Sequence, residues 1–118
     1  MLGYLAAGFV LGAVKAVTYG AKRDEPLGHA LLGLGPDALA EEVTYRLGLE
    51  RWGLRSALGV APETARLATA ALFGLGHANP IDAAVGGYLY SRAYDAGGLP
   101  LATFAHVAHN LSAVLLSR

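Results

Sequence analysis

The sequence predicts an all-α fold, a small polytopic membrane bundle of about four to five short helices. Of its 118 residues, 54% are hydrophobic and only 15% are charged. The mean hydropathy is +0.42, and the apolar residues fall in blocks close to membrane-spanning length. Sixteen glycines are scattered through these blocks, which is commoner in membrane helices than in soluble ones. A soluble, alanine-rich helical bundle is the alternative.

Length and charge exclude several classes of protein. A chain of 118 residues is expected to form a single domain. Nine basic and nine acidic residues give a net charge of zero, so we expect no nucleic-acid partner. The chain has no cysteine, which excludes disulfides, thiolate metal sites and cysteine nucleophiles.

The N-terminal segment, residues 1–26, is predicted to be an additional spanning helix and its loop. Residues 1–21 are almost continuously apolar, apart from Lys15 and Thr18, and about 20 such residues suffice to cross a bilayer. The polar cluster at residues 22–26 is expected to end this helix. No basic region precedes the apolar run, so a signal peptide is not favoured.

The second apolar stretch is interrupted by proline. Because proline suits the first turn of a helix, we expect a helix from Pro36 to about Leu49. Whether residues 27–34 form a separate short helix stays open. Residues 50–61 are expected to form an interfacial loop or a short amphipathic turn, in which Trp52 lies between arginines as an anchor at headgroup level.

Three further helices are expected in the rest of the chain. One begins at Pro62 and ends near His77, before Asn79 and Pro80. The next covers residues 82–94 and ends at a glycine signal in residues 95–98. The last begins at residues 99–100 and contains His106, His109 and Asn110.

An acidic motif lies where an apolar protein tolerates charge least. Glu42 and Arg46 are four residues apart with the acid first, which favours an ion pair along one helix face. Two adjacent carboxylates in a low dielectric resist being ionised together. We therefore expect Glu42 and Arg46 to be structural and Glu41 to be the working base.

Three more polar side chains have helical spacing. His77 follows Phe73 by four residues, and a histidine near a carboxylate can orient and deprotonate a water molecule. His106 and Asn110 are also four apart and could direct hydrogen-bond donors at a developing oxyanion. Taken singly, each has a structural alternative, as a helix-end hydrogen bond or an interhelical polar clamp. His109 has no obvious spacing partner.

In this order, the three motifs resemble those of the CPBP family of intramembrane glutamic proteases, also called the CAAX prenyl endopeptidase or Abi family. The resemblance covers residues 36–118 and leaves the first helix outside the catalytic core. The matching motifs are Glu41-Glu42-x-x-x-Arg46, Phe73-x-x-x-His77 and His106-x-x-x-Asn110.

The resemblance implies a membrane endopeptidase whose catalytic groups face an internal cavity. Glu41 and His77 would activate the attacking water, and His106 and Asn110 would stabilise the oxyanion. Glu42, Arg46 and Phe73 would support them, with no cofactor and no metal. The expected partners are membrane lipids and a membrane-associated peptide or protein substrate, and the expected location is the bacterial inner membrane. The small size favours a homo-oligomer or a larger membrane complex.

Two other functions stay open at this point. A non-catalytic membrane subunit or scaffold, for example in bacteriocin immunity, could use the same polar residues to hold its helices together. A zinc or iron site built from Glu41, Glu42, His77 and His106 is the third hypothesis, although no His-Glu-x-x-His ligand helix is present.

Overall fold

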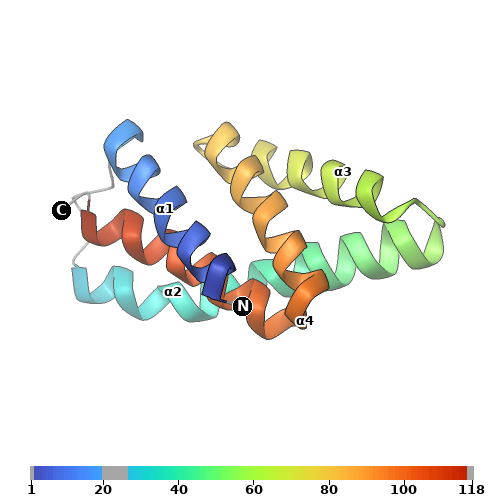
Figure 1. Ribbon diagram of the computed structural model, residues 1–118, viewed down its shortest axis with the longest axis horizontal. Coiled ribbons are helices and arrows are strands. Elements are labelled where there is room, and N and C mark those ends of the chain that lie inside the picture. The colour runs from blue at the N-terminus through green and yellow to red at the C-terminus, as the bar shows by residue number, and fades with distance from the viewer. Residues whose placement is uncertain (1, 20–26, 117–118) are drawn as a thin grey trace.

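The computed structural model describes residues 2–19 and 27–116, and it is helical almost throughout (Figure 1). The predicted all-α fold is confirmed, because this part of the chain contains helices and short turns but no strand. The helices are α1 (Leu2–Tyr19), α2 (Leu27–Glu42), η1 (Val43–Ala57), α3 (Pro62–Leu75) and α4 (Pro80–Leu116).

Helix α1 packs closely on the C-terminal half of α4. Gly8 and Gly12 face this contact, and a β-carbon at Gly12 would lie 1.7 Å from Ser112 Oγ. The Ser112 hydroxyl donates a hydrogen bond of 3.0 Å to the carbonyl of Phe9. The absence of side chains on the two glycines thus lets the backbones approach. The polar cluster expected after this helix, residues 22–26, lies outside the described residues.

Two expectations about the second apolar stretch are wrong. The helix does not begin at Pro36, because α2 starts at Leu27 and continues through this proline. The predicted loop at residues 50–61 is helical as far as Ala57, and only residues 58–61 connect η1 to α3. η1 is a wider helix that follows α2 without a break. Within residues 50–57, Glu50 bonds to Ser91 and Arg55 pairs with Asp95, both on α4, and local sequence does not reveal these partners.

Helices α3 and α4 lie close to their predicted positions. α3 begins at Pro62, and His77 lies in the turn after it rather than on the helix. α4 is two helices joined at Gly98, whose φ of 72° and ψ of −164° suit glycine and strain other residues. Figure 1 shows the two halves running in different directions. The glycine break predicted at residues 95–98 is confirmed.

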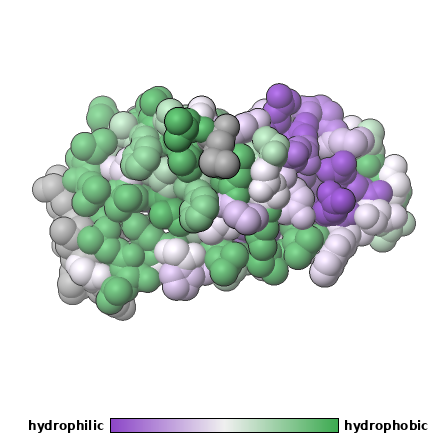
Figure 2. Space-filling model, turned by 60° about the horizontal axis from the view of Figure 1, so that its bottom comes forward, coloured by the Kyte–Doolittle hydropathy of each residue, from purple (hydrophilic) through white to green (hydrophobic). Residues whose placement is uncertain are grey.

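The core is built from small side chains around a few aromatic ones. Phe73, Tyr90 and Leu101 pack with buried alanines of α4. Figure 2 shows hydrophilic residues gathered at one end of the molecule, while much of the remaining visible surface is apolar. Within the described ranges, Pro80–Leu116 is long and apolar enough to cross a membrane, and Leu2–Val17 is a shorter apolar helix.

Candidate active site

Glu41 and His77 lie in direct contact although 36 residues separate them. Glu41 is near the C-terminal end of α2, and His77 lies in the turn after α3. Glu41 Oε2 is 2.9 Å from His77 Nε2. Both side chains are about one-third exposed, at 32% for Glu41 and 33% for His77, so a small molecule can reach the pair.

The hydrogen bonds of His77 determine how many protons the pair holds. The Nδ1–H group of His77 donates to the carbonyl of Phe73 at 2.5 Å, because a carbonyl oxygen can only accept. Nε2 therefore faces Glu41 without a proton of its own in a neutral ring. A bond between this nitrogen and a carboxylate oxygen requires one shared proton. This hydrogen bond links the accessible carboxylate to the His77 ring.

His106 is hydrogen-bonded to the other carboxylate. Its Nδ1–H group donates to Glu42 Oε2 at 2.8 Å, and both side chains are almost fully buried, at 3% and 0% exposed. The Phe73 ring lies between the two histidines. Its centroid is 4.2 Å from that of His77 and 5.7 Å from that of His106. Adjacent carboxylates thus serve different histidines.

The expected ion pair between Glu42 and Arg46 is present and fully buried. Arg46 Nε lies 3.1 Å from Glu42 Oε1, without hydrogen-bond geometry. The guanidinium carbon also lies 5.5 Å from the Phe73 centroid and 6.0 Å from that of Tyr90, so aromatic faces surround the charge. One turn further along η1, Glu50 Oε1 is 4.0 Å from Arg46 Nη1.

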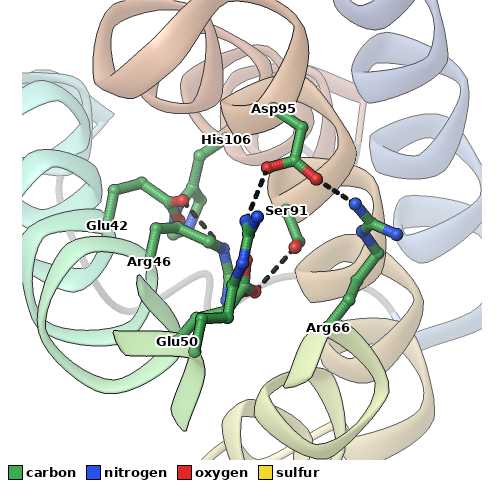
Figure 3. Close-up of polar contacts among 8 residues, drawn as sticks. Glu42, Arg46, Glu50, Arg66, Ser91, Asp95 and His106 are labelled. Atoms are coloured by element: carbon green, nitrogen blue, oxygen red, sulfur yellow. Dashed lines mark hydrogen bonds and ion pairs between the residues drawn. The ribbon is translucent and has the colours of Figure 1, made fainter. Parts of the chain in front are cut away.

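Polar contacts continue from this pair towards α4, as Figure 3 shows. The Ser91 hydroxyl donates to Glu50 at 2.6 Å. Burial raises the pKa of the Glu50 carboxyl, although the hydrogen bond from Ser91 and the charge of Arg46 oppose this rise. Nearby, Asp95 pairs with both Arg55 and Arg66. These contacts join η1, α3 and α4 next to the buried Arg46.

Asn110 is not brought into contact with the other predicted site residues. It is partly buried on α4, one turn after His106, and its side chain makes no hydrogen bond with the described residues. Two pockets among the described residues lie away from this site. One is lined by α1 and the first half of α4, and the other by Arg51, Arg55 and neighbouring residues.

Sequence reasoning did not predict the contacts of three side chains next to the site, those of Tyr90, His109 and Asp82. Tyr90 stacks on the His106 ring, with centroids 4.3 Å apart and an angle of 12° between the ring planes. The Tyr90 hydroxyl is hydrogen-bonded to His109 Nδ1, and His109 Nε2 lies 3.1 Å from Asp82 Oδ1. The signal was the spacing of Asp82, Gly86 and Tyr90, which places these residues on one helix face with a glycine between two polar groups.

The fold and site define a class of protein, a small helical protein whose described residues include a buried polar core and one accessible carboxylate–histidine pair. Residues 24–112 match the family model of the type II CAAX prenyl endopeptidases, Rce1-like. The match covers most of the chain, and the protein belongs to this family of membrane-integral proteases. Helix α1 lies before the matched residues. Comparisons with curated proteins and with solved structures give no match.

Proposed function

We propose that the protein is an endopeptidase of the inner bacterial membrane, which hydrolyses a peptide bond with a water molecule activated by Glu41 and His77. The contact of 2.9 Å between Glu41 and His77 carries this proposal, because both side chains are accessible while the surrounding polar groups are buried. The family name supplies the substrate class to test, prenylated peptides that end in a CAAX sequence.

Glu41 is the proposed base. Its Oε2 atom contacts His77, which leaves Oε1 to accept a proton from the attacking water. As the water oxygen bonds to the carbonyl carbon, the electron pair of the C=O bond moves to the carbonyl oxygen. When the tetrahedral intermediate collapses, the C–N bond breaks and the pair returns the proton to the leaving amine. No metal ion takes part in this scheme.

His106 and Asn110 are the proposed donors to the oxyanion. Because Nδ1–H of His106 is committed to Glu42, the ring can donate through Nε2 only when it is an imidazolium ion. The carboxylate of Glu42 stabilises that charge. Glu42 therefore has two tasks, to pair with Arg46 and to support a cationic His106. Asn110 contributes its side-chain amide from the next turn of the same helix.

The test compares wild type with Glu41→Gln in lipid nanodiscs. The substrate is a farnesylated CAAX peptide, an unprenylated copy is its partner, and mass spectrometry locates the cleaved bond. We expect Glu41→Gln to lower kcat at least about 100-fold, the usual contribution of a general base. A matched control is Glu63→Gln, an exposed carboxylate at the start of α3. Cleavage by Glu41→Gln at the wild-type rate would refute the assignment.

The alternative from the sequence is a non-catalytic membrane subunit. The fully buried contacts of Glu42, Arg46 and Glu50 favour it, since such networks also hold helices together. It predicts that neither peptide is hydrolysed and that Glu41→Gln changes assembly or stability instead. Hydrolysis that depends on both Glu41 and His77 would exclude this alternative.

A further inference from the structure

A second cluster of polar side chains, three of them buried and one partly exposed, lies next to the proposed site. It comprises Asp82 and Tyr90 from the first half of α4, His109 from the second half, and Lys15 from α1, and we call these four residues the Asp82 cluster. The side chains of Asp82 and His109 are 8% and 2% exposed, and Tyr90 is 1% exposed. Lys15 Nζ lies 3.7 Å from Asp82 Oδ2. The proposed reaction uses none of them.

Hydrogen bonding fixes one arrangement of the cluster. The Nε2–H group of His109 donates to Asp82, since a carboxylate oxygen accepts. Nδ1 of a neutral His109 is then an acceptor, and the Tyr90 hydroxyl donates to it. Lys15 balances the charge of Asp82. In the series Lys15–Asp82–His109–Tyr90, each charge thus faces an opposite charge and each hydrogen-bond donor an acceptor.

The backbone leaves room for this arrangement at Gly86. A β-carbon there would lie 2.8 Å from the Tyr90 hydroxyl and 2.9 Å from His109 Nδ1. These distances are shorter than real β-carbons tolerate, so any other residue would force Tyr90 and His109 apart. The close approach of the two halves of α4 at this point depends on glycine.

The Asp82 cluster reaches the site through one aromatic contact. The Tyr90 hydroxyl is hydrogen-bonded to His109, and the Tyr90 ring stacks on the His106 imidazole with centroids 4.3 Å apart. Phe73 meets the same imidazole edge-on, with ring planes 76° apart. Together with the hydrogen bond to Glu42, these contacts leave His106 little freedom to rotate. An oxyanion donor must be held in this way to stay aimed.

We propose that the Asp82 cluster positions His106, and that α1 completes the cluster through Lys15. This proposal rests on the proposed role of His106 in catalysis. Tyr90 and His109 act through His106 and do not touch the substrate. Helix α1, which precedes the residues matched by the family, is in this proposal a working part of the site.

The activity test separates the hydrogen bond from the stack. Tyr90→Phe keeps the ring and loses the bond to His109, while Tyr90→Leu loses the stack as well. We expect kcat to fall about 5-fold for Tyr90→Phe and about 100-fold for Tyr90→Leu with KM unchanged, because small misplacements of a catalytic group carry costs of this size. Tyr88→Phe is the matched control, since Tyr88 lies on the same helix as Tyr90 and loses a hydroxyl bond to Glu63 of α3.

The contribution of α1 is tested at the ion pair. Lys15→Met is expected to lower kcat about 3-fold, and Asp82→Lys with Lys15→Asp is expected to recover part of the activity that Asp82→Lys alone loses. Equal kcat values for wild type, Lys15→Met and Tyr90→Leu would overturn the proposal. So would a KM that rises while kcat is constant.

A spectroscopic readout keeps this proposal distinct from the proposed function. Histidine ring nitrogens labelled with ¹⁵N report the protonation and hydrogen bonding of His106 and His109 in a protein that need not cleave anything. Tyr90→Phe should shift the signals of both rings, and Tyr88→Phe should shift neither. Unchanged His106 signals in Tyr90→Phe and Tyr90→Leu would refute the positioning role. Absence of cleavage by the wild type would instead refute the proposed function.

Discussion

Arg46 provides the sharpest test of how the buried charges support the fold. It is fully buried beside Glu42 and Glu50, and its nitrogens lie 3.1 Å and 4.0 Å from the two carboxylates. Arg46→Met keeps most of the side-chain volume but leaves these carboxylates without their cation. Removing one partner of a buried ion pair costs about 3–5 kcal/mol. That is a large part of the roughly 5–15 kcal/mol that stabilises a typical domain.

The assay is unfolding in mixed detergent micelles, followed by helical circular dichroism. A loss of about 3–5 kcal/mol changes the folding equilibrium constant roughly 150- to 5,000-fold. The control is Arg46→Met combined with Glu42→Gln and Glu50→Gln, which removes all three charges. Neutral replacements of buried ion pairs are often tolerated, so this triple variant should recover most of the loss. A loss below about 1 kcal/mol for Arg46→Met, or a triple variant that is less stable still, would refute the reasoning.

Three further outcomes are expected. Burial raises the pKa of Glu50 above 4.5, so the contribution of this carboxyl to the free energy of unfolding is full below pH 4.5 and is lost as the pH rises through the folded-state pKa. Glu50→Gln should therefore be more stable than wild type at neutral pH, and equal stability of the two proteins at all pH values would contradict this. Gly12→Ala should cost about 1–3 kcal/mol, because the new β-carbon would meet Ser112 Oγ and the carbonyl of His109, whereas Gly3→Ala meets nothing within 4 Å and should be neutral in the same unfolding measurement. Cleavage should continue after dialysis against a chelator, and loss of activity that returns with added zinc would show instead that a metal takes part.

The sequence could predict the fold class and the pairing of Glu42 with Arg46, because both follow from local periodicity. The continuation of the helix past Glu50 to Ala57 could not be predicted. Three of its close neighbours carry charge, which favours an interfacial loop when only the local sequence is considered. The partner that keeps Glu50 inside the bundle is Ser91, 41 residues away. No spacing rule connects residues that far apart.

The same limit applies to the candidate site. Spacing placed His106 beside Asn110 on one helix face, but the hydrogen bond that dictates the protonation of His106 comes from Glu42 on α2. His109 had no predicted partner because its partners depend on how the two halves of α4 meet. The way the two halves of α4 pack follows from the backbone angles at Gly98. The glycine signal in the sequence predicts a break there but not its φ and ψ.

Gly98 also bears on how the chain is threaded through a bilayer. Straight, the 37 residues of α4 would span about 55 Å, longer than the 43 Å extent of the molecule. Bent at Gly98, each half is about 27 Å long, close to the thickness of a bilayer core. For two halves that each cross the bilayer, Pro80 and Leu116 lie on the same side, whereas one straight helix would put them on opposite sides. In that arrangement the backbone conformation of Gly98, non-helical in both φ and ψ, sets the direction of the half that carries His106 relative to the half that carries Tyr90.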